Sequence, residues 1–105
     1  MSSPKQRSKL LMESENYHVE NGEHYSTFSR RYHDFLGFAD LVCVHKETGD
    51  VILVQSTSDS NVSSRVNKIT NHENLPIARK AGWGIQVHGW KKKLSRWRVR
   101  REDLS

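Results

Sequence analysis

Two apolar segments lie close together in the chain: Gly37-Phe38-Ala39-Asp40-Leu41-Val42-Cys43-Val44 and Val51-Ile52-Leu53-Val54-Gln55-Ser56-Thr57. Their composition, and the short polar segment 46–50 between them, predict two strands joined by a tight loop. Pairing the strands around that loop places Asp40 opposite residue 56, to within one position. A carboxylate and a polar trio then meet at one end of a sheet, which is how a hard metal ion is usually held.

Asp40 also has a simpler interpretation, as a solvated strand end or a cap. Its neighbours favour a site, because Phe38 and Ala39 precede it and four apolar residues follow. An acid at the edge of a core needs a metal or another cation to stabilise its charge.

The end of the second strand leaves two interpretations open. Gln55 and Thr57 share a strand face with Val51 and Leu53, so this face changes from apolar to polar. The strand either leaves the core and leads into a helix N-cap, or it ends at a site beside the start of a helix at 58–61. Amide groups at a helix N-terminus attract phosphate.

Size and charge limit the classes of function. The chain has 105 residues and a net charge of +5, which predicts one small domain with a polyanionic partner such as nucleic acid. Its hydrophobic content of 34% is low, so we expect an oligomer interface to supply part of the burial. No apolar run reaches membrane-spanning length and no signal-peptide pattern opens the chain, and Cys43 lies in an apolar strand. We therefore expect a protein of the reducing cytoplasm.

The remaining pattern predicts these elements: a helix over 5–16, a hairpin of strands 17–20 and 24–28, a loop over 29–35, a helix with Val62, Val66 and Ile69 on one face, a short helix over 77–80, a strand over 85–88, a charged turn over 91–93 and a strand over 96–100. Residues 1–4 are expected to be disordered. The six histidines show no ligand spacing and are expected to be scattered over the surface.

These motifs resemble those of a known superfamily. An aspartate, a gap of fifteen residues, an apolar strand with a polar end and then a helix are similar to the core of the PD-(D/E)xK nucleases. Within that superfamily the region from Tyr17 to Trp90 most resembles small phage and archaeal Holliday-junction resolvases. The resemblance implies an α/β fold of restriction-endonuclease type, a mixed central β-sheet flanked by α-helices.

The resemblance also implies roles for individual residues. Asp40 would be the central metal-binding carboxylate, Gln55 a neutral metal ligand, and Ser56 the source of a strand carbonyl. Thr57 stands where the family has its catalytic lysine, which is a departure from the family pattern.

Two further roles would have to come from elsewhere. Lys68 on the following helix is the first candidate to replace the missing lysine, and Arg65 is the second. The family's upstream acid aligns with Lys5 and Arg7, which are not acidic, so Glu23 is favoured among the nearby acids. The implied cofactor is Mg²⁺, for which Mn²⁺ can substitute, with no organic cofactor.

A second signal is the basic C-terminal segment 91–101. Its cations, interleaved with aromatic residues, indicate contacts with nucleic-acid phosphates, and the residues that we assign to such contacts are Lys91, Lys92, Lys93, Arg96, Arg98 and Arg100. Arg30 and Arg31, upstream of Asp40, form a smaller patch that could guide a strand into the site. The simpler interpretation of the C-terminal segment is a solvated, solubilising strand.

These inferences predict a Mg²⁺-dependent DNA endonuclease, selective for branched DNA in the manner of a Holliday-junction resolvase. Two symmetric cuts need two sites, which predicts a homodimer. The alternative is a non-catalytic nucleic-acid-binding module on the same fold, favoured by the missing lysine.

Overall fold

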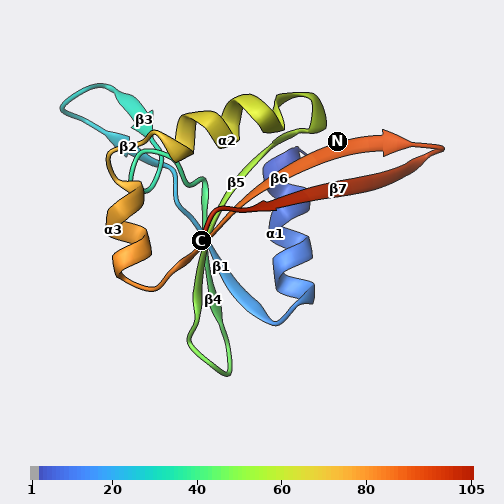
Figure 1. The fold of residues 1–105 in the computed structure, drawn as a ribbon, viewed down its shortest axis with the longest axis horizontal. Coiled ribbons are helices and arrows are strands. Elements are labelled where there is room, and N and C mark those ends of the chain that lie inside the picture. The colour runs from blue at the N-terminus through green and yellow to red at the C-terminus, as the bar shows by residue number, and fades with distance from the viewer. Residues whose placement is uncertain (1–2) are drawn as a thin grey trace.

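The computed structural model describes residues 3–105. Figure 1 shows a mixed α/β fold whose elements follow in this order: α1 (Pro4–Ser14), β1 (Tyr17–Asn21), β2 (His24–Ser26), β3 (Arg31–His33), β4 (Leu41–His45), β5 (Val51–Ser58), the 3-10 helix η1 (Asp59–Asn61), α2 (Val62–Thr70), α3 (Leu75–Lys80), β6 (Gly84–Lys93) and β7 (Arg96–Asp103). A five-stranded sheet in the order β1-β4-β5-β6-β7 forms the centre, and β2 and β3 form a separate two-stranded sheet.

The central sheet is mixed. Strands β1, β4 and β5 are antiparallel neighbours, whereas β5 and β6 are parallel and are connected through α2 and α3. The predicted pair of apolar strands is confirmed as β4 and β5. Their register joins Leu41 to Val54, so Asp40 faces Gln55, within one position of the prediction.

Helices cover both faces of this sheet, because β4 and the first half of β5 carry apolar side chains on both faces. On one face Met12 of α1 packs against Leu41, Cys43 and Val54. On the other face the strands pack against the buried residues of α2 and α3, which are Val62, Ile69, Leu75 and Ala78. The predicted apolar face of the helix after β5 is thereby confirmed, and Cys43 is a core residue.

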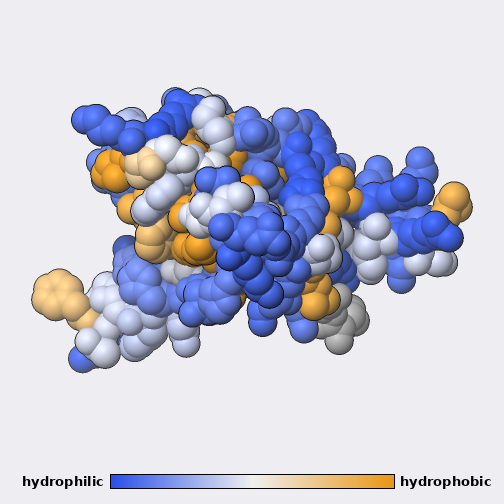
Figure 2. All heavy atoms as spheres, turned by 90° about the horizontal axis from the view of Figure 1, so that it is seen from below, coloured by the Kyte–Doolittle hydropathy of each residue, from blue (hydrophilic) through white to orange (hydrophobic). Residues whose placement is uncertain are grey.

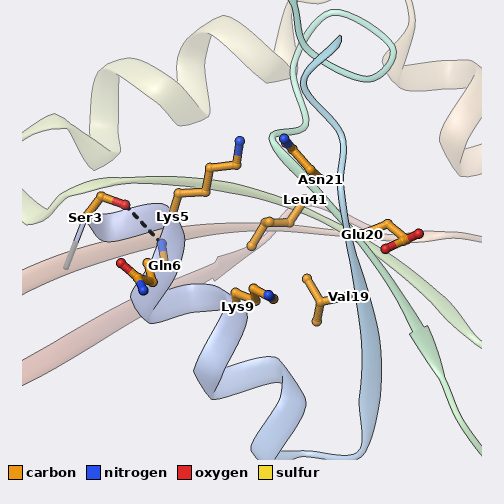
Figure 3. Close-up of a pocket in the computed structure, with 8 residues that line it drawn as sticks. All are labelled: Ser3, Lys5, Gln6, Lys9, Val19, Glu20, Asn21 and Leu41. Carbon is orange, nitrogen blue, oxygen red and sulfur yellow. Dashed lines mark hydrogen bonds between the residues drawn. The ribbon is translucent and has the colours of Figure 1, made fainter.

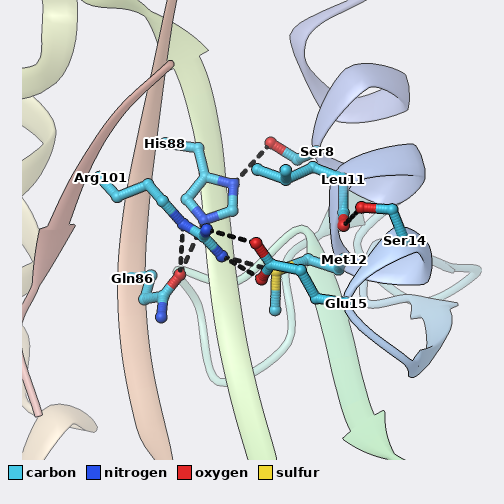
Figure 4. Close-up of polar contacts among 8 residues, drawn as sticks. All are labelled: Ser8, Leu11, Met12, Ser14, Glu15, Gln86, His88 and Arg101. Atoms are coloured by element: carbon cyan, nitrogen blue, oxygen red, sulfur yellow. Dashed lines mark hydrogen bonds and ion pairs between the residues drawn. The ribbon is translucent and has the colours of Figure 1, made fainter.

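A chain of buried polar contacts fixes α1 to the sheet (Figure 4). Ser8 Oγ lies 2.9 Å from His88 Nδ1, and His88 Nε2 lies 2.8 Å from Gln86 Oε1. Trp90 Nε1 donates to Ser8 Oγ, so the serine hydroxyl donates onward to Nδ1, and Nε2–H donates to Gln86. This arrangement satisfies a neutral imidazole at both nitrogens.

An ion pair closes the same cluster at the other end of α1. Arg101 on β7 makes two hydrogen bonds of 2.7 Å to the Glu15 carboxylate (Figure 4). The Arg101 guanidinium lowers the pKa of Glu15, chiefly through these hydrogen bonds. Arg101 is therefore a structural residue rather than one of the free cations of its strand.

The N-terminal half of the chain differs from the sequence-based predictions in two places. The predicted hairpin of 17–20 with 24–28 is wrong, because β1 pairs with β4 while β2 pairs with β3 inside the predicted loop 29–35. Disorder is wrong for Ser3, whose hydroxyl accepts from Gln6 N and caps α1, and for Pro4, the first residue of that helix. Residues 1 and 2 lie outside the described residues.

The C-terminal half of the chain also differs from the predictions in two places. Residues 91–93 are not a turn, because β6 continues to Lys93 and the chain reverses at Leu94 and Ser95, both at positive φ. The histidines are not all on the surface, since His88 is fully buried. His88 can be buried because Ser8 and Gln86 satisfy both of its ring nitrogens. The spacing of the histidines in the sequence does not predict these partners.

The face of the molecule shown in Figure 2 is predominantly polar, with separate hydrophobic spots. Two hairpins, β2–β3 and β6–β7, project from the body in opposite directions (Figure 1). Within residues 3–105, no helix combines the length and the apolar character needed to cross a membrane.

Candidate functional site

Asp40 lies where the β4–β5 pairing ends. Just before β4 the chain turns back on itself, and the carbonyl of Ala39 accepts from Phe35 N at 2.8 Å instead of from β5. The Asp40 carboxylate replaces this backbone carbonyl as the acceptor for β5: its Oδ1 and Oδ2 accept from Ser56 N at 3.2 and 3.3 Å. The side chain thus extends the hydrogen-bonding ladder by one position.

This carboxylate is buried beside neutral groups. Asp40 is 7% exposed, and Gln55 Nε2 donates to its Oδ2 at 3.2 Å. Burial raises the pKa of Asp40 to about 7, against the lowering effect of the Ser56 hydrogen bond; the charge of Asp34 raises the pKa further and that of Lys5 lowers it. An asparagine could cap Ser56 N equally well without a charge, so the presence of an acid favours a cation site.

Lys5 on α1 brings a positive charge toward Asp40. It lines a pocket of about 370 Å³ between the start of α1 and strands β1 and β4 (Figure 3), which also contains Lys9, Asn21 and Leu41, the neighbour of Asp40. Lys5 and Arg7 stand where the resemblance to the nuclease family leads us to expect an upstream acid, and neither is acidic. Of the two, Lys5 brings a positive charge toward Asp40 from α1.

The residues around Asp40 fit a hard cation in part. Asp40 offers two carboxylate oxygens, and Gln55 offers an amide oxygen after rotation of its side chain. The hydroxyl of Ser56 is buried without a hydrogen-bond partner among the described residues, but side chains alternate along β5, so it points to the face opposite Gln55. Across residues 3–105, no three His, Cys, Asp or Glu side chains form a group that could hold a metal. A metal here would draw its remaining ligands from water and from a bound phosphate.

The other predicted site residues lie in varied places. Thr57 is buried in β5, on the same face as Gln55. The side chains of Glu23, Lys68 and Arg65 are exposed or half-buried, and the described contacts do not join them to Asp40. The charges that act on Asp40 are instead those of Asp34 and Lys5, so the roles of Glu23, Lys68 and Arg65 stay predictions.

The basic hairpin, β6–β7 between Lys91 and Arg100, exposes all of its predicted cations. Its register sets Lys91 opposite Arg98 and Lys93 opposite Arg96. Like charges in directly opposed positions destabilise a strand pair. A polyanion bound along this face would remove that repulsion, whereas a hairpin selected only for solubility needs no such pairing. Of these cations, Arg100 is paired with Glu102 at 2.8 Å.

Comparisons with known proteins yield no matching family model, no matching curated protein and no matching solved structure. What the structure establishes is therefore a mixed α/β domain with a five-stranded mixed sheet and helices on both faces. Its function is inferred from the Asp40 site and from the two projecting hairpins.

Proposed function

We propose that this protein is a metal-dependent DNA endonuclease of restriction-endonuclease-like fold that hydrolyses phosphodiester bonds and prefers branched DNA, as Holliday-junction resolvases do. The observation that carries the proposal is the buried Asp40 carboxylate, at the end of β4 and β5, surrounded by neutral donors. The succession of α1, antiparallel β1, β4 and β5, and a helical connection to parallel β6 supports it. We place its action in the cytoplasm of a bacterium or of a phage-infected cell.

Asp40, Gln55 and the carbonyl of Ser56 would hold Mg²⁺, or Mn²⁺ in its place. The ion would supply a polarised water and neutralise charge that develops on the phosphate. Lys5 would attract the phosphate toward the site from the α1 side, because its charge already acts on Asp40. Thr57 is neutral and buried, so it contributes packing and no charge.

A second function is favoured by a separate observation. The hydrogen bonds from Ser56 N give Asp40 a structural role at the sheet end, and Thr57 replaces the expected lysine. These features suit a nucleic-acid-binding module without catalytic activity. For either function we propose a homodimer, whose interface would cover some of the exposed apolar side chains.

The test of the endonuclease is cleavage of end-labelled four-way-junction DNA and of matched linear duplex, in Mg²⁺, in Mn²⁺ and in EDTA. Wild type should nick the junction symmetrically only with the metal, and Asp40→Asn should lower the rate by about 100-fold or more, as is typical when a preorganised electrostatic group is removed. Asp50→Asn makes the same chemical change in the exposed β4–β5 turn and should leave the rate unchanged.

Each of the other outcomes would change one part of the proposed function. Equal cutting of junction and duplex would keep the nuclease and remove the preference for branches. Binding without cutting in either metal would contradict the endonuclease and support the binding module. Cleavage that survives Asp40→Asn would remove Asp40 from the site.

The basic hairpin gives a prediction about salt. Replacing Lys91, Lys93, Arg96 and Arg98 together by alanine should weaken DNA binding at every sequence, because these cations face phosphate in the proposed complex. Every phosphate that is no longer neutralised should reduce the slope of log Kd against log salt by about 0.9. Fluorescence anisotropy at four salt concentrations measures this slope, and Lys80→Ala on α3 is the control. An unchanged slope would show that the hairpin is only a solvated surface.

A further inference from the structure

The hairpin β2–β3 has an aromatic face and a polar, basic face. Tyr25 pairs with Tyr32 across it, with ring centroids 5.1 Å apart in an edge-to-face arrangement, and both rings are more than half exposed. Because side chains alternate along a strand, the pair of Ser26 and Arg31 points to the opposite face. We call residues 24–33 the aromatic hairpin; it extends away from the body (Figure 1).

Phe28 lies at the tip of this hairpin and is 99% exposed. The turn that carries it is held by hydrogen bonds: Arg30 N donates to Ser26 O at 2.8 Å and Ser29 N to Ser26 Oγ at 3.3 Å, while Ser29 Oγ lies 2.6 Å from His33 Nε2. The phenyl ring is thus held in water by an ordered turn. The ring adds nothing to the core, so folding alone does not require a large aromatic residue at this position.

Both ends of the aromatic hairpin are attached beside Asp40. At its start Gly22 N donates to Asp40 O at 2.9 Å, and a Cβ on Gly22 would lie 2.6 Å from Ala39 O, so only glycine allows this contact. At its end Phe35 bonds to Ala39. β2 is three residues long, so the strand part of the aromatic hairpin spans about 10 Å, and the turn that carries Phe28 lies beyond it.

We propose that the aromatic hairpin is a base-stacking finger for unpaired nucleotides of branched DNA, with Phe28 stacked on a base beyond the nucleotide whose phosphate lies at Asp40, and with Arg30 and Arg31 on the backbone. This inference rests on the DNA partner of the proposed function. Exposed aromatic rings bind bases of any sequence through their π-faces when cations track the backbone alongside. A second copy of this chain is a poorer occupant, because the tip carries two arginines and the chain as a whole has a charge of +5.

The experiment measures DNA binding in EDTA, where no cleavage interferes, with three-way-junction DNA that carries 2-aminopurine in a single-stranded arm. Stacking on Phe28 should change the fluorescence of this base analogue. Phe28→Leu keeps an apolar tip but cannot stack; it should abolish the fluorescence change and raise Kd for the single-stranded arm about tenfold, with little effect on plain duplex. Phe28→Tyr should restore both. Ile77→Ala removes an exposed apolar side chain from α3, outside both hairpins; it is the matched control and should behave as wild type.

The outcomes separate this inference from the proposed function. If Phe28→Leu binds and alters fluorescence as wild type does, the finger is overturned while DNA binding stands. If wild type binds none of these DNAs, the proposed function and the finger both fail. If Phe28→Leu instead changes the sedimentation of the free protein and leaves the 2-aminopurine signal intact, the tip is a contact between copies and the finger is overturned.

Discussion

Asp40→Asn should make the protein more stable at pH 8, although the same substitution removes the proposed catalysis. Burial raises the pKa of Asp40 from 3.8 to about 7, so the native fold holds an ionised carboxylate at pH 8 that it disfavours. Three pKa units correspond to about 4 kcal/mol, which is the upper bound for the gain in the free energy of unfolding. Asparagine keeps an oxygen for Ser56 N, and its amide can donate to Gln55 once that side chain rotates.

The effect should disappear in acid. Because the folded-state pKa of Asp40 lies above its unfolded value, the favourable contribution of the protonated group is present below pH 4 and is lost as the pH rises through 7. Asp40→Asn should therefore match wild type near pH 4 and exceed it progressively up to pH 8. Urea unfolding at several pH values measures this difference.

A matched variant and a metal titration complete the test. Asp50→Asn changes an exposed aspartate in the β4–β5 turn and should alter stability by less than about 0.5 kcal/mol. Mg²⁺ should stabilise wild type, by about 1.4 kcal/mol at ten times its Kd, and leave Asp40→Asn unaffected. A variant that is less stable than wild type at pH 8 would show that a cationic partner already compensates the Asp40 charge in the metal-free fold.

Sequence reasoning succeeded where the pattern was local. The β4–β5 hairpin and its register follow from two apolar runs and a five-residue polar loop, and that register is what brings Asp40 to Gln55 and Ser56. The apolar face of α2 follows from helical spacing for the same reason. In these elements the residues that the local pattern marks as apolar are also the ones that the fold buries, so the pattern alone predicts the element and its buried face.

It failed where partners are distant along the chain. Asn21-Gly22 is a strong hairpin signal, yet β1 pairs with β4, because Val19 must cover the apolar face beneath α1. Lys5 reaches the Asp40 site from a helix thirty-five positions away, and the cluster around His88 joins α1 to β6 and β7. No spacing rule reports such contacts, since they depend on how layers pack.

The second large effect concerns His88, whose burial lowers its pKa to about 4, helped by the charge of Arg101 and opposed by that of Glu15. Because the folded-state pKa lies below the unfolded value of 6.5, the native state loses stability as the pH falls from 6.5 to 4. The loss amounts to about 3 kcal/mol at two and a half pKa units. Protonation would also give Nδ1 a hydrogen that points at the Ser8 hydroxyl, which already accepts from Trp90.

Asp40 and His88 titrate over nearly the same pH range, and their effects on the free energy of unfolding have opposite signs. In wild type the two pH dependences should therefore largely cancel. The free energy of unfolding of wild type should stay nearly flat between pH 4 and 6.5, whereas that of Asp40→Asn should fall by about 3 kcal/mol as the pH is lowered across this range. Adding His88→Asn to Asp40→Asn should remove this slope, whatever the absolute stability of the double variant. A slope that persists in the double variant would assign it to other groups, and a steep fall in wild type would contradict the raised pKa of Asp40. The two buried groups thus act at opposite ends of the range: the Asp40 carboxyl is least favourable above pH 7, where it is ionised, and the His88 imidazole is least favourable near pH 4, where it is protonated.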